Sequence, residues 1–358
     1  MHDDFILARE LAERNRFSED IISDESIDYK GSADQIKSHL SQSDLQVSSA
    51  VTPHLSKSLE KVIKRLQMPS DSVEAFVYSM PGIQAESYCG SSSQCVIRFS
   101  SGLIDILNAE EIEFVAGHEI GHFLLNHGMF SSDVRAHSLE HFMHFRSQEI
   151  SADRIGLLAC QSINVALKSL MKLVSGLGDK HLRFDITKFI SQLKNVSEIH
   201  SFVDQTSTHP SILVRSRALL WFSLTDYYLQ GAENYSANKM KKLDERVIKD
   251  LTKFIDGPTK KLIEEAKNSH ALWLTISDMV DDGVFDANEQ KILNESFGED
   301  NLKGFLNLIE GRSKKEVIEI SSQKLKESRE ELAQLIPMSF KNEEMIIKKK
   351  VLGLLEMN

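Results

Sequence analysis

The chain of 358 residues contains little cysteine, little proline and no long apolar run. Its three cysteines, Cys89, Cys95 and Cys160, are too few for a disulfide framework and predict a reducing compartment, hence a cytoplasmic location. A membrane-spanning helix needs about 20 consecutive apolar residues, and charges interrupt the longest apolar stretches here. Because Met1–Asp4 is acidic and no apolar segment follows it, we expect no secretory leader and a soluble protein.

Basic charge is also in the minority, since 42 Lys and Arg stand against 53 Asp and Glu and the net charge is -11. A protein that binds nucleic acid or an anionic membrane surface usually has a basic patch, so we expect neither partner. The six prolines and the many segments of helical periodicity predict a mostly helical protein. At 41% hydrophobic residues, the chain is large enough for two or three folded units.

A His-Glu-Ile-Gly-His run is the most informative feature that is present. On a helix, side chains four residues apart point the same way, so His118 and His122 can bind one metal ion with Glu119 beside its water molecule. Asn108 as N-cap and Glu111 three residues later predict where this helix begins. An ordinary amphipathic helix is the alternative, but a carboxylate on its inner side is costly without a charged partner. The run therefore indicates metal-dependent hydrolysis.

A catalytic zinc site needs a third protein ligand. Glu149 and Asp153 are four residues apart and would share one face of a second helix. We predict that Glu149 completes the site and that Asp153 accepts the free ring N–H of a ligating histidine. His127 lies five residues after His122, which rotates it off the ligand face. Composition alone leaves four competing ligands open: Glu140, His141, His144 and His127.

Three motifs then occur in a fixed order: the His-Glu-Ile-Gly-His run, Glu-Ile-Ser-Ala-Asp-Arg at 149–154, and Thr-His-Pro-Ser at 208–211, followed by Arg215. This order resembles the signature of the gluzincin peptidases that include HtpX and the type I CAAX prenyl proteases, metallopeptidase family 48. The resemblance covers roughly residues 50–225. Three upstream segments also resemble the lead-in of that family: Ala75-Phe76, Pro81-Gly82 and Gly102-Leu103-Ile104.

The resemblance implies a minimal gluzincin catalytic core of α+β class, mostly helical and with a small sheet. It implies one zinc ion per chain, held by His118, His122 and Glu149, with Glu119 as general base. In gluzincins an extended peptide adds to an exposed sheet edge, and we expect that edge at Val96–Phe99. A plain core strand is the alternative for this segment.

His209 and Arg215 have less defined roles. His209 is a candidate for binding the transition-state oxyanion, and Arg215 either assists it or holds the carboxylates of the site. The alternative is that His209 caps a helix and Arg215 forms a structural ion pair.

The chain departs from the best-known family members in two respects. Those members span the membrane several times, whereas this sequence predicts no spanning helix, so the prenyl-protein substrate class is not expected here. About ten extra residues lie between Pro81-Gly82 and Val96. We expect them to form a loop in front of the motif helix that shapes or covers the cleft. Cys89 and Cys95 are expected to be thiols, although they could pair or bind zinc.

Composition and the family resemblance together predict three parts: an N-terminal helix and acidic linker at 1–48, the zinc peptidase domain that the resemblance implies at 49–238, and a helical domain at 239–358. The last part has a weakly TerB-like signature between Asp278 and Glu289, which also partly fits a calcium-binding EF-hand loop. Val280 stands where such a loop needs a ligand, so an acidic turn between two helices is the preferred interpretation. Further elements are expected as helices around Phe5–Leu11 and over 50–66, 162–176 and 185–196, as strands at 73–78 and 96–99, and as a turn at His209-Pro210 followed by a helix.

Together these features predict a soluble zinc-dependent endopeptidase, acting on a peptide or protein substrate, with a protein partner for the C-terminal domain. The alternative is a non-proteolytic adaptor that keeps zinc for structure and binds a partner through that domain. Because a structural zinc usually has four protein ligands, a site with three ligands and an intact Glu119 favours the enzyme.

Overall fold

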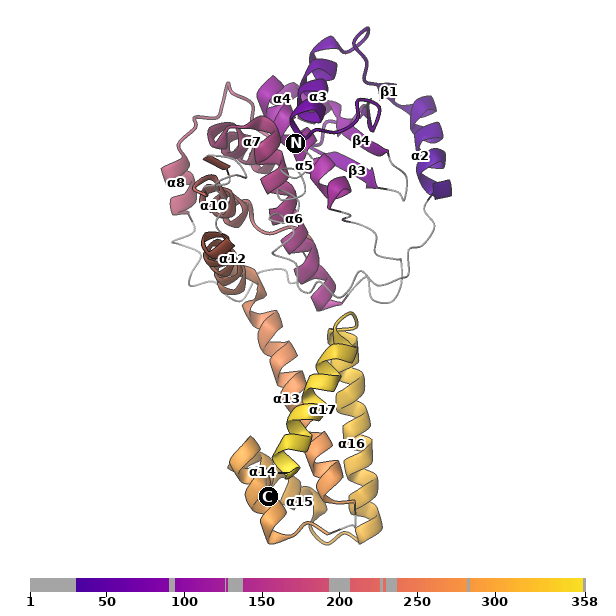
Figure 1. Ribbon diagram of the computed structural model, residues 1–358, viewed down its shortest axis with the longest axis vertical. Helices are drawn as coiled ribbons and strands as arrows, with labels where there is room; N and C mark the ends of the chain where they lie inside the picture. The colour runs from indigo at the N-terminus through magenta and orange to yellow at the C-terminus, as the bar shows by residue number, and fades with distance from the viewer. Residues whose placement is uncertain are drawn as a thin grey trace. The chain divides into compact units, whose positions relative to one another are not determined.

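The computed structural model describes residues 30–89, 94–125, 127, 138–192, 207–225, 228–229, 237–281 and 284–356. The chain divides into two compact units: unit 1 contains Met1–Asp133 and Met143–Asp256, and unit 2 contains Val134–Phe142 and Gly257–Asn358. Most described residues are helical and the described strands form one sheet (Figure 1), which confirms the α+β, mostly helical fold class. None of the described helices is long and apolar enough to cross a membrane. The predicted helix around Phe5–Leu11 lies outside the described residues.

The sheet of unit 1 has the strand order β1-β2-β4-β3, with bounds β1 Leu45–Gln46, β2 Val73–Tyr78, β3 Ala85–Cys89 and β4 Cys95–Ser100. Strands β2 and β4 are parallel, with Val73 opposite Cys95, and both match predicted strands. Strands β1 and β3 run antiparallel to their neighbours. Since β4 lies between β2 and β3, nearly all its side chains are buried, as its β-branched and aromatic residues favour.

The expectation that Val96–Phe99 is an exposed sheet edge is therefore wrong. Those residues belong to β4, which is paired on both sides. In the part of the sheet that the structure describes, β3 pairs with β4 alone and is an edge strand. The extra residues after Pro81-Gly82 are also not simply a loop, because Ala85–Cys89 forms this strand.

The helix of the His-Glu-Ile-Gly-His run, α5 (Ala109–Leu124), begins where its sequence predicts. The side chain of Asn108 accepts hydrogen bonds from the backbone N–H groups of Glu110 and Glu111, both at 3.0 Å. The carboxylate of Glu111 in turn accepts the N–H of Asn108 at 2.8 Å. An N-cap of this kind is worth about 1 kcal/mol, and it fixes the helical register that places His118 and His122 on one side.

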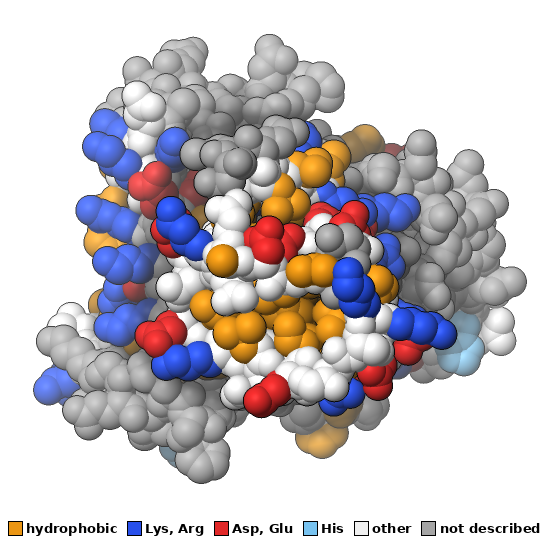
Figure 2. Space-filling model, turned by 90° about the horizontal axis from the view of Figure 1, so that it is seen from below, with side chains coloured by type: hydrophobic (Ala, Val, Ile, Leu, Met, Phe, Trp, Pro, Cys, Tyr) orange, Lys and Arg blue, Asp and Glu red, His pale blue; other side chains and the backbone are white. Residues whose placement is uncertain are grey.

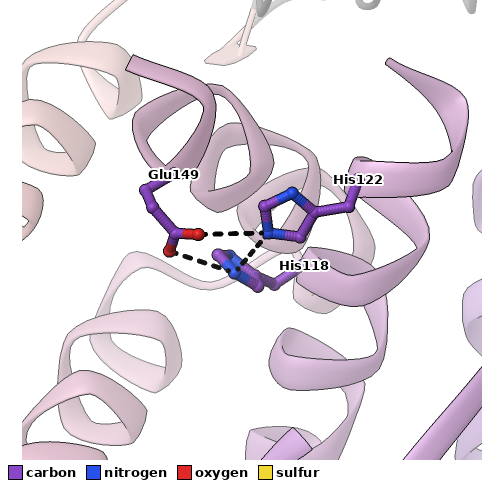
Figure 3. A group of neighbouring side chains, drawn as sticks. All are labelled: His118, His122 and Glu149. Carbon is purple, nitrogen blue, oxygen red and sulfur yellow. Dashed lines mark hydrogen bonds and ion pairs between the residues drawn. The ribbon is translucent and has the colours of Figure 1, made fainter. Parts of the chain in front are cut away.

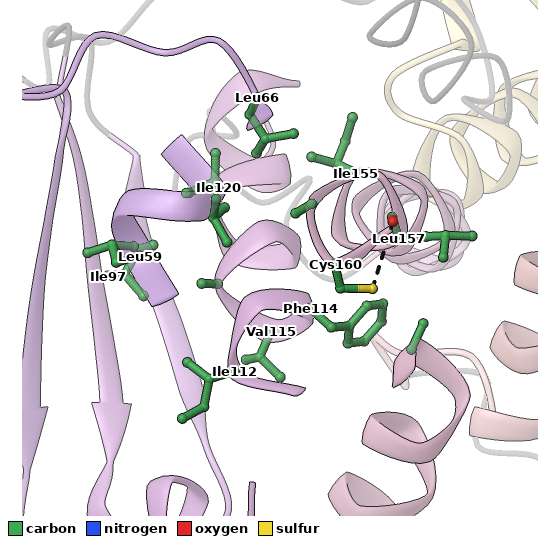
Figure 4. Close-up of a cluster of buried hydrophobic side chains, with 14 of the residues drawn as sticks. Leu59, Leu66, Ile97, Ile112, Phe114, Val115, Ile120, Ile155, Leu157 and Cys160 are labelled. Carbon is green, nitrogen blue, oxygen red and sulfur yellow. Dashed lines mark hydrogen bonds between the residues drawn. The ribbon is translucent and has the colours of Figure 1, made fainter. Parts of the chain in front are cut away.

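Helix α6 (Leu139–Cys160) packs against α5 at very short range, because small residues line the contact. A Cβ atom added to Gly117 would lie 2.3 Å from the Cβ atom of Ala159, and one added to Gly121 would lie 3.0 Å from the Cβ atom of Ile155. This approach brings the carboxylates of α6 next to the histidines of α5. The same packing buries a set of apolar side chains (Figure 4), among them Phe114, Val115, Ile120, Ile155 and Leu157.

The remaining helices of unit 1 surround this pair. Helix α3 confirms the helix predicted over 50–66 and packs on α5, and α7 confirms the one predicted over 162–176. Helix α8 covers the first half of the segment predicted as helix over 185–196, and residues 193–206 lie outside the described part. The bounds are α2 Lys30–Ser43, α3 Pro53–Arg65, α4 Ser101–Ile106, α7 Ile163–Ser175, α8 Ile186–Ser191, α10 Ile212–Ser223, α12 Ala237–Leu251 and a π-helical turn, η4, Thr252–Asp256.

Two buried arginines of α6 connect it to the last elements of unit 1. Arg154 Nη2 lies 3.3 Å from Asp244 Oδ1 on α12, and Arg146 Nε lies 2.9 Å from Asp256 Oδ1 on η4. Arg146 also donates to the carbonyl oxygen of Ser207 at 2.6 Å. Removing one partner of a buried ion pair costs about 3–5 kcal/mol, so residues 237–256 contribute to the stability of unit 1.

A pair of truncations tests this contribution. A chain ending at Asn238 lacks both aspartates, and we expect its free energy of unfolding to be at least about 3 kcal/mol lower than that of a chain ending at Asp256. Denaturant unfolding of both truncations measures the difference. Equal stability of the two chains would contradict it. The divisions at residues 48 and 238 stay predictions, and the same truncations test the second of them.

The described part of unit 2 contains five further helices, and α13 packs on both α16 and α17. Their bounds are α13 Gly257–Met279, α14 Ala287–Phe297, α15 Glu299–Ile309, α16 Lys314–Leu335 and α17 Phe340–Glu356. Its core includes Ile276, Val280, Leu293, Phe305 and Val317. In the space-filling view from below, apolar side chains gather in the middle of the face with charged side chains around them (Figure 2).

The last residues of the acidic segment of unit 2 form the N-terminal cap of α14. The side chain of Asp286 caps this helix, and the carboxylate of Glu289 accepts the backbone N–H of Asp286 at 2.7 Å. The calcium interpretation requires the carboxylates of Asp286 and Glu289 as ligands, but both accept backbone N–H groups here. The helix that this cap begins, with α13 before it, agrees with the preferred acidic turn between two helices. The TerB-like signature stays a prediction.

Candidate metal centre

The structure brings the three predicted metal ligands together (Figure 3). His118 Nε2 and His122 Nε2 are 3.1 Å apart. Glu149 Oε2 lies 3.5 Å from His118 Nε2, and Glu149 Oε1 lies 3.3 Å from His122 Nε2. Ligands about 2 Å from one tetrahedral ion are roughly 3.3 Å from each other. The two imidazole nitrogens and the carboxylate of Glu149 are therefore close enough to bind one metal ion, with one ligand atom of each residue within 4.8 Å of the others.

The contacts of these donors also fit a cation between them. Glu149 Oε2 is buried and accepts no hydrogen bond of good geometry, although Arg215 Nη1 lies 3.2 Å away. Burial by itself would lower the pKa of His118, but hydrogen bonds to Asp153 and Glu149 and their negative charges raise it to about 10. Burial would raise the pKa of Glu149, yet the charge of Arg215 and hydrogen bonds from His118 and His122 hold it well below its usual range. Such surroundings stabilise positive charge at the point where the three donors meet.

Asp153 lies where the sequence places it, behind His118. Its Oδ1 atom is 3.0 Å from His118 Nδ1, so the Nε2 atom of that ring is left facing the other donors. Arg215, on α10, binds the same carboxylate through Nε at 2.7 Å and Nη2 at 2.6 Å. Burial would raise the pKa of Asp153, but the charge of Arg215 and the hydrogen bonds lower it. Asp153 is thus a charged partner for His118.

Glu119 and His209 complete the set of predicted site residues. The side chain of Glu119 lies mostly buried, and within the described part of the chain it has no hydrogen bond or ion pair. Among the described residues, none therefore occupies its carboxylate oxygens through a hydrogen bond or ion pair. The side chain of His209 is 62% exposed, with Nε2 3.4 Å from Glu149 Oε1. Its Nδ1 atom is 2.8 Å from Thr208 Oγ1.

The competing ligand candidates lie elsewhere. Glu140 accepts hydrogen bonds from the backbone N–H groups of Met338 and Ser339, at the start of α17. His144 Nε2 is 2.9 Å from Gln148 Nε2. Within the described residues, His118, His122 and Glu149 are the one group of at least three His, Cys, Asp or Glu side chains with metal-binding spacing, so Cys95, Cys160 and His141 do not belong to such a group.

His127 makes a contact near the site that the sequence did not predict. It is not in the ligand group, but its Nδ1 atom lies 2.9 Å from His122 Nδ1. His127 lies beyond the last residue of α5, Leu124, so the geometry of an unbroken helix does not describe its position. The backbone N–H of His127 donates to the carbonyl oxygen of His122 at 2.8 Å. The sequence signal that could have indicated this contact is the presence of a histidine shortly after the expected end of the helix.

The short distance between α5 and α6 yields a prediction for Gly121. A Cβ atom there would lie 3.1 Å from the Cα atom of Ala152 and 3.0 Å from Ile155 Cβ, neither of which can rotate away. We expect Gly121→Ala to shift α6, with the carboxylate of Glu149, and to weaken metal binding roughly 10-fold or more. Metal affinity measured by chelator competition checks this. Gly304→Ala on α15 is the control, because nothing lies within 4 Å of its Cβ position and alanine favours a helix.

Comparison with known proteins agrees with this geometry. The model of peptidase family M48 matches residues 49–145 and 136–221. The plastoglobule-localized metallopeptidase 48, chloroplastic, of Arabidopsis thaliana is 23% identical over 176 residues, which cover 42% of this chain and 51% of that protein. The chain thus spans about half the length of this curated relative. No solved structure matches the chain. The ordered motifs, the His-His-Glu group and the family match lead to one conclusion: the chain belongs, through residues 49–221, to peptidase family M48.

Proposed function

We propose that this protein is a zinc-dependent endopeptidase. The observation that carries the proposal is the group of His118, His122 and Glu149 inside a domain of peptidase family M48, with Glu119 next to His118 in the sequence. Two histidines and one glutamate are a ligand set of catalytic zinc sites, whereas structural zinc sites usually have four protein ligands. A zinc ion held there would acidify a bound water molecule and polarise the carbonyl group of the substrate.

Glu119 has the central role among the residues of the chain. Glu119 follows His118 directly in the sequence, and its carboxylate forms no hydrogen bond or ion pair with another described residue. It takes the proton of the water molecule as that water attacks the peptide carbonyl, and then delivers this proton to the leaving amine. A carboxylate that is mostly buried but not hydrogen bonded suits both transfers.

Arg215 and His209 have different roles in this proposal. Arg215 is almost fully buried and contacts Asp153 and Glu149, so it holds the carboxylates of the site. His209 is exposed next to Glu149, where its ring can donate a hydrogen bond to the oxyanion of the tetrahedral intermediate. Of the two roles considered for Arg215, its burial among the carboxylates supports the role of holding them rather than that of assisting the oxyanion.

The free edge of β3 is the place we propose for an extended peptide substrate. The backbone N–H of Ser100 donates to the carbonyl oxygen of Gln84 at 3.0 Å, which fixes the phase of the antiparallel ladder. Alternate residues in such a ladder point their backbone groups toward the neighbouring strand. Those of Glu86 therefore face β4, and those of Ser87 face the free edge. Main-chain bonding of this kind accepts many sequences, which suits an endopeptidase.

The location and the partners follow from other features. The low cysteine content supports a cytoplasmic location, and burial raises the pKa of the Cys160 thiol to about 11, so that it stays protonated. The exposed apolar side chains of α17, Met345, Ile346 and Leu352, support a protein partner for unit 2.

Proteolysis of a denatured general substrate tests the proposed function. The full chain, loaded with one equivalent of zinc, should cleave it, a chelator should stop cleavage, and added zinc should restore it. Zinc bound without cleavage, under conditions in which the chain is folded, would instead support the non-proteolytic adaptor.

A further inference from the structure

The two histidine ligands have different partners behind them. His118 Nδ1 lies 3.0 Å from the carboxylate of Asp153. His122 Nδ1 lies 2.9 Å from Nδ1 of another histidine, His127. In both rings Nε2 is the atom that faces the donor group. One ligand histidine of the site is therefore hydrogen bonded to a carboxylate, and the other contacts a further histidine.

We propose that His127 is a positioning residue, which accepts the Nδ1–H of His122 and thereby holds this ring in the orientation and tautomer that binds zinc through Nε2. The inference rests on the proposed function, because it concerns the same metal site. It adds a residue outside the three motifs from which the site was predicted.

The proton count of the two rings supports this direction of the hydrogen bond. A neutral imidazole carries one proton, and a ring nitrogen that binds a metal uses its lone pair. His122 must then carry its proton on Nδ1, and the atom 2.9 Å away must be an acceptor. Nδ1 of His127 is that acceptor when the proton of its ring is on Nε2. Two rings in contact through Nδ1 thus form one hydrogen bond with a defined donor.

The backbone holds His127 in place for this contact. Its N–H donates to the carbonyl oxygen of His122 at 2.8 Å, so the two residues are joined both through the main chain and through their rings. The rings meet edge to face, with centroids 5.0 Å apart and an interplanar angle of 67°. His127 is only 3% exposed. A buried ring that is fixed at its backbone keeps its partner in one rotamer.

The experiment compares His127→Asn with His127→Leu in the full chain. The two side chains have similar size, but only asparagine has an acceptor, its Oδ1, at the distance from the backbone at which histidine has Nδ1. Zinc affinity is measured by chelator competition, and the electronic spectrum of the cobalt-substituted protein reports the ligand geometry. We expect His127→Leu to bind zinc roughly 10 to 100-fold more weakly and to change the cobalt spectrum. His127→Asn should stay close to the unchanged chain in both.

Three outcomes separate the inference from the proposed function. If His127→Leu binds zinc as tightly as the unchanged chain, the inference is wrong and the proposed function stands. If both variants lose affinity equally, packing rather than the acceptor matters, and the inference is again wrong. If the unchanged chain itself binds no zinc, the proposed function fails. Should His127→Leu not fold, His127→Phe, which keeps a ring without an acceptor, takes its place with the same expected loss.

Discussion

Replacement of Glu119 by glutamine should abolish peptide hydrolysis and leave the fold and the zinc content unchanged. Glutamine keeps the size of the side chain but cannot take up the proton of the attacking water. The metal should remain, since all three proposed ligands are intact and the side chain of Glu119 contacts none of them through a hydrogen bond or ion pair in the described residues. General base catalysis alone contributes about 10²- to 10⁴-fold. The loss should be larger, because the same carboxylate also protonates the leaving amine.

The measurement pairs the cleavage rate of a denatured substrate with the zinc content of the same sample. Glu110→Gln is the matched control, because Glu110 is an exposed glutamate on the same helix. It should cleave at the rate of the unchanged chain. Near-normal activity of Glu119→Gln at full zinc occupancy would show that the proposed mechanism is wrong, even in a chain of this family.

Replacement of both His118 and His122 by alanine should remove the zinc altogether, and activity with it. The double variant leaves Glu149 as the single proposed ligand. A ligand that binds the native state alone stabilises it by about 4 kcal/mol at 1,000 times its dissociation constant. Added zinc should therefore raise the melting temperature of the unchanged chain but not that of the double variant. Retention of stoichiometric zinc after dialysis would disprove the ligand assignment.

Single substitutions in the carboxylates should give graded losses of zinc affinity. Glu149→Gln replaces a proposed ligand, so zinc occupancy and activity should fall together. Asp153→Asn keeps the ligands but replaces the charged partner of His118, and an affinity loss of roughly 10 to 100-fold is typical of such residues. For the double variant of His118 and His122, the control is the double variant His54→Ala, His181→Ala, because both of these histidines are exposed. This variant should keep its zinc.

Local sequence determined the elements that carry the metal site. The capping box at Asn108 and Glu111 set the beginning of α5, and the spacing of four residues put His118 and His122 on one side of it. These relations depend on hydrogen bonds and helical periodicity within a few residues, so they can be predicted without the rest of the fold. The strands β2 and β4 were predictable for the same reason, because their β-branched and aromatic residues are concentrated locally.

Only the tertiary structure decided which strand is the sheet edge. The composition of Val96–Phe99 predicts a strand, but strand order depends on pairing between segments far apart in the chain. The sequence did not predict β3 and indicated a loop there, because Ala-Glu-Ser-Tyr-Cys lacks the alternation of apolar and polar residues that is typical of a strand. The edge that we propose for the substrate is therefore that of β3 and not that of β4.

The surroundings of the ligands were also decided by tertiary contacts. Arg215 lies 62 residues after Asp153 in the sequence, yet it binds that carboxylate through two nitrogens. His127, which lies beyond the end of α5, contacts His122 through both its ring and its backbone N–H, which a helical projection does not describe. Helical periodicity relates only residues of one helix, whereas these contacts depend on how helices end and on how closely they pack. The sequence thus determined the proposed zinc ligands, and the tertiary structure decided what holds them.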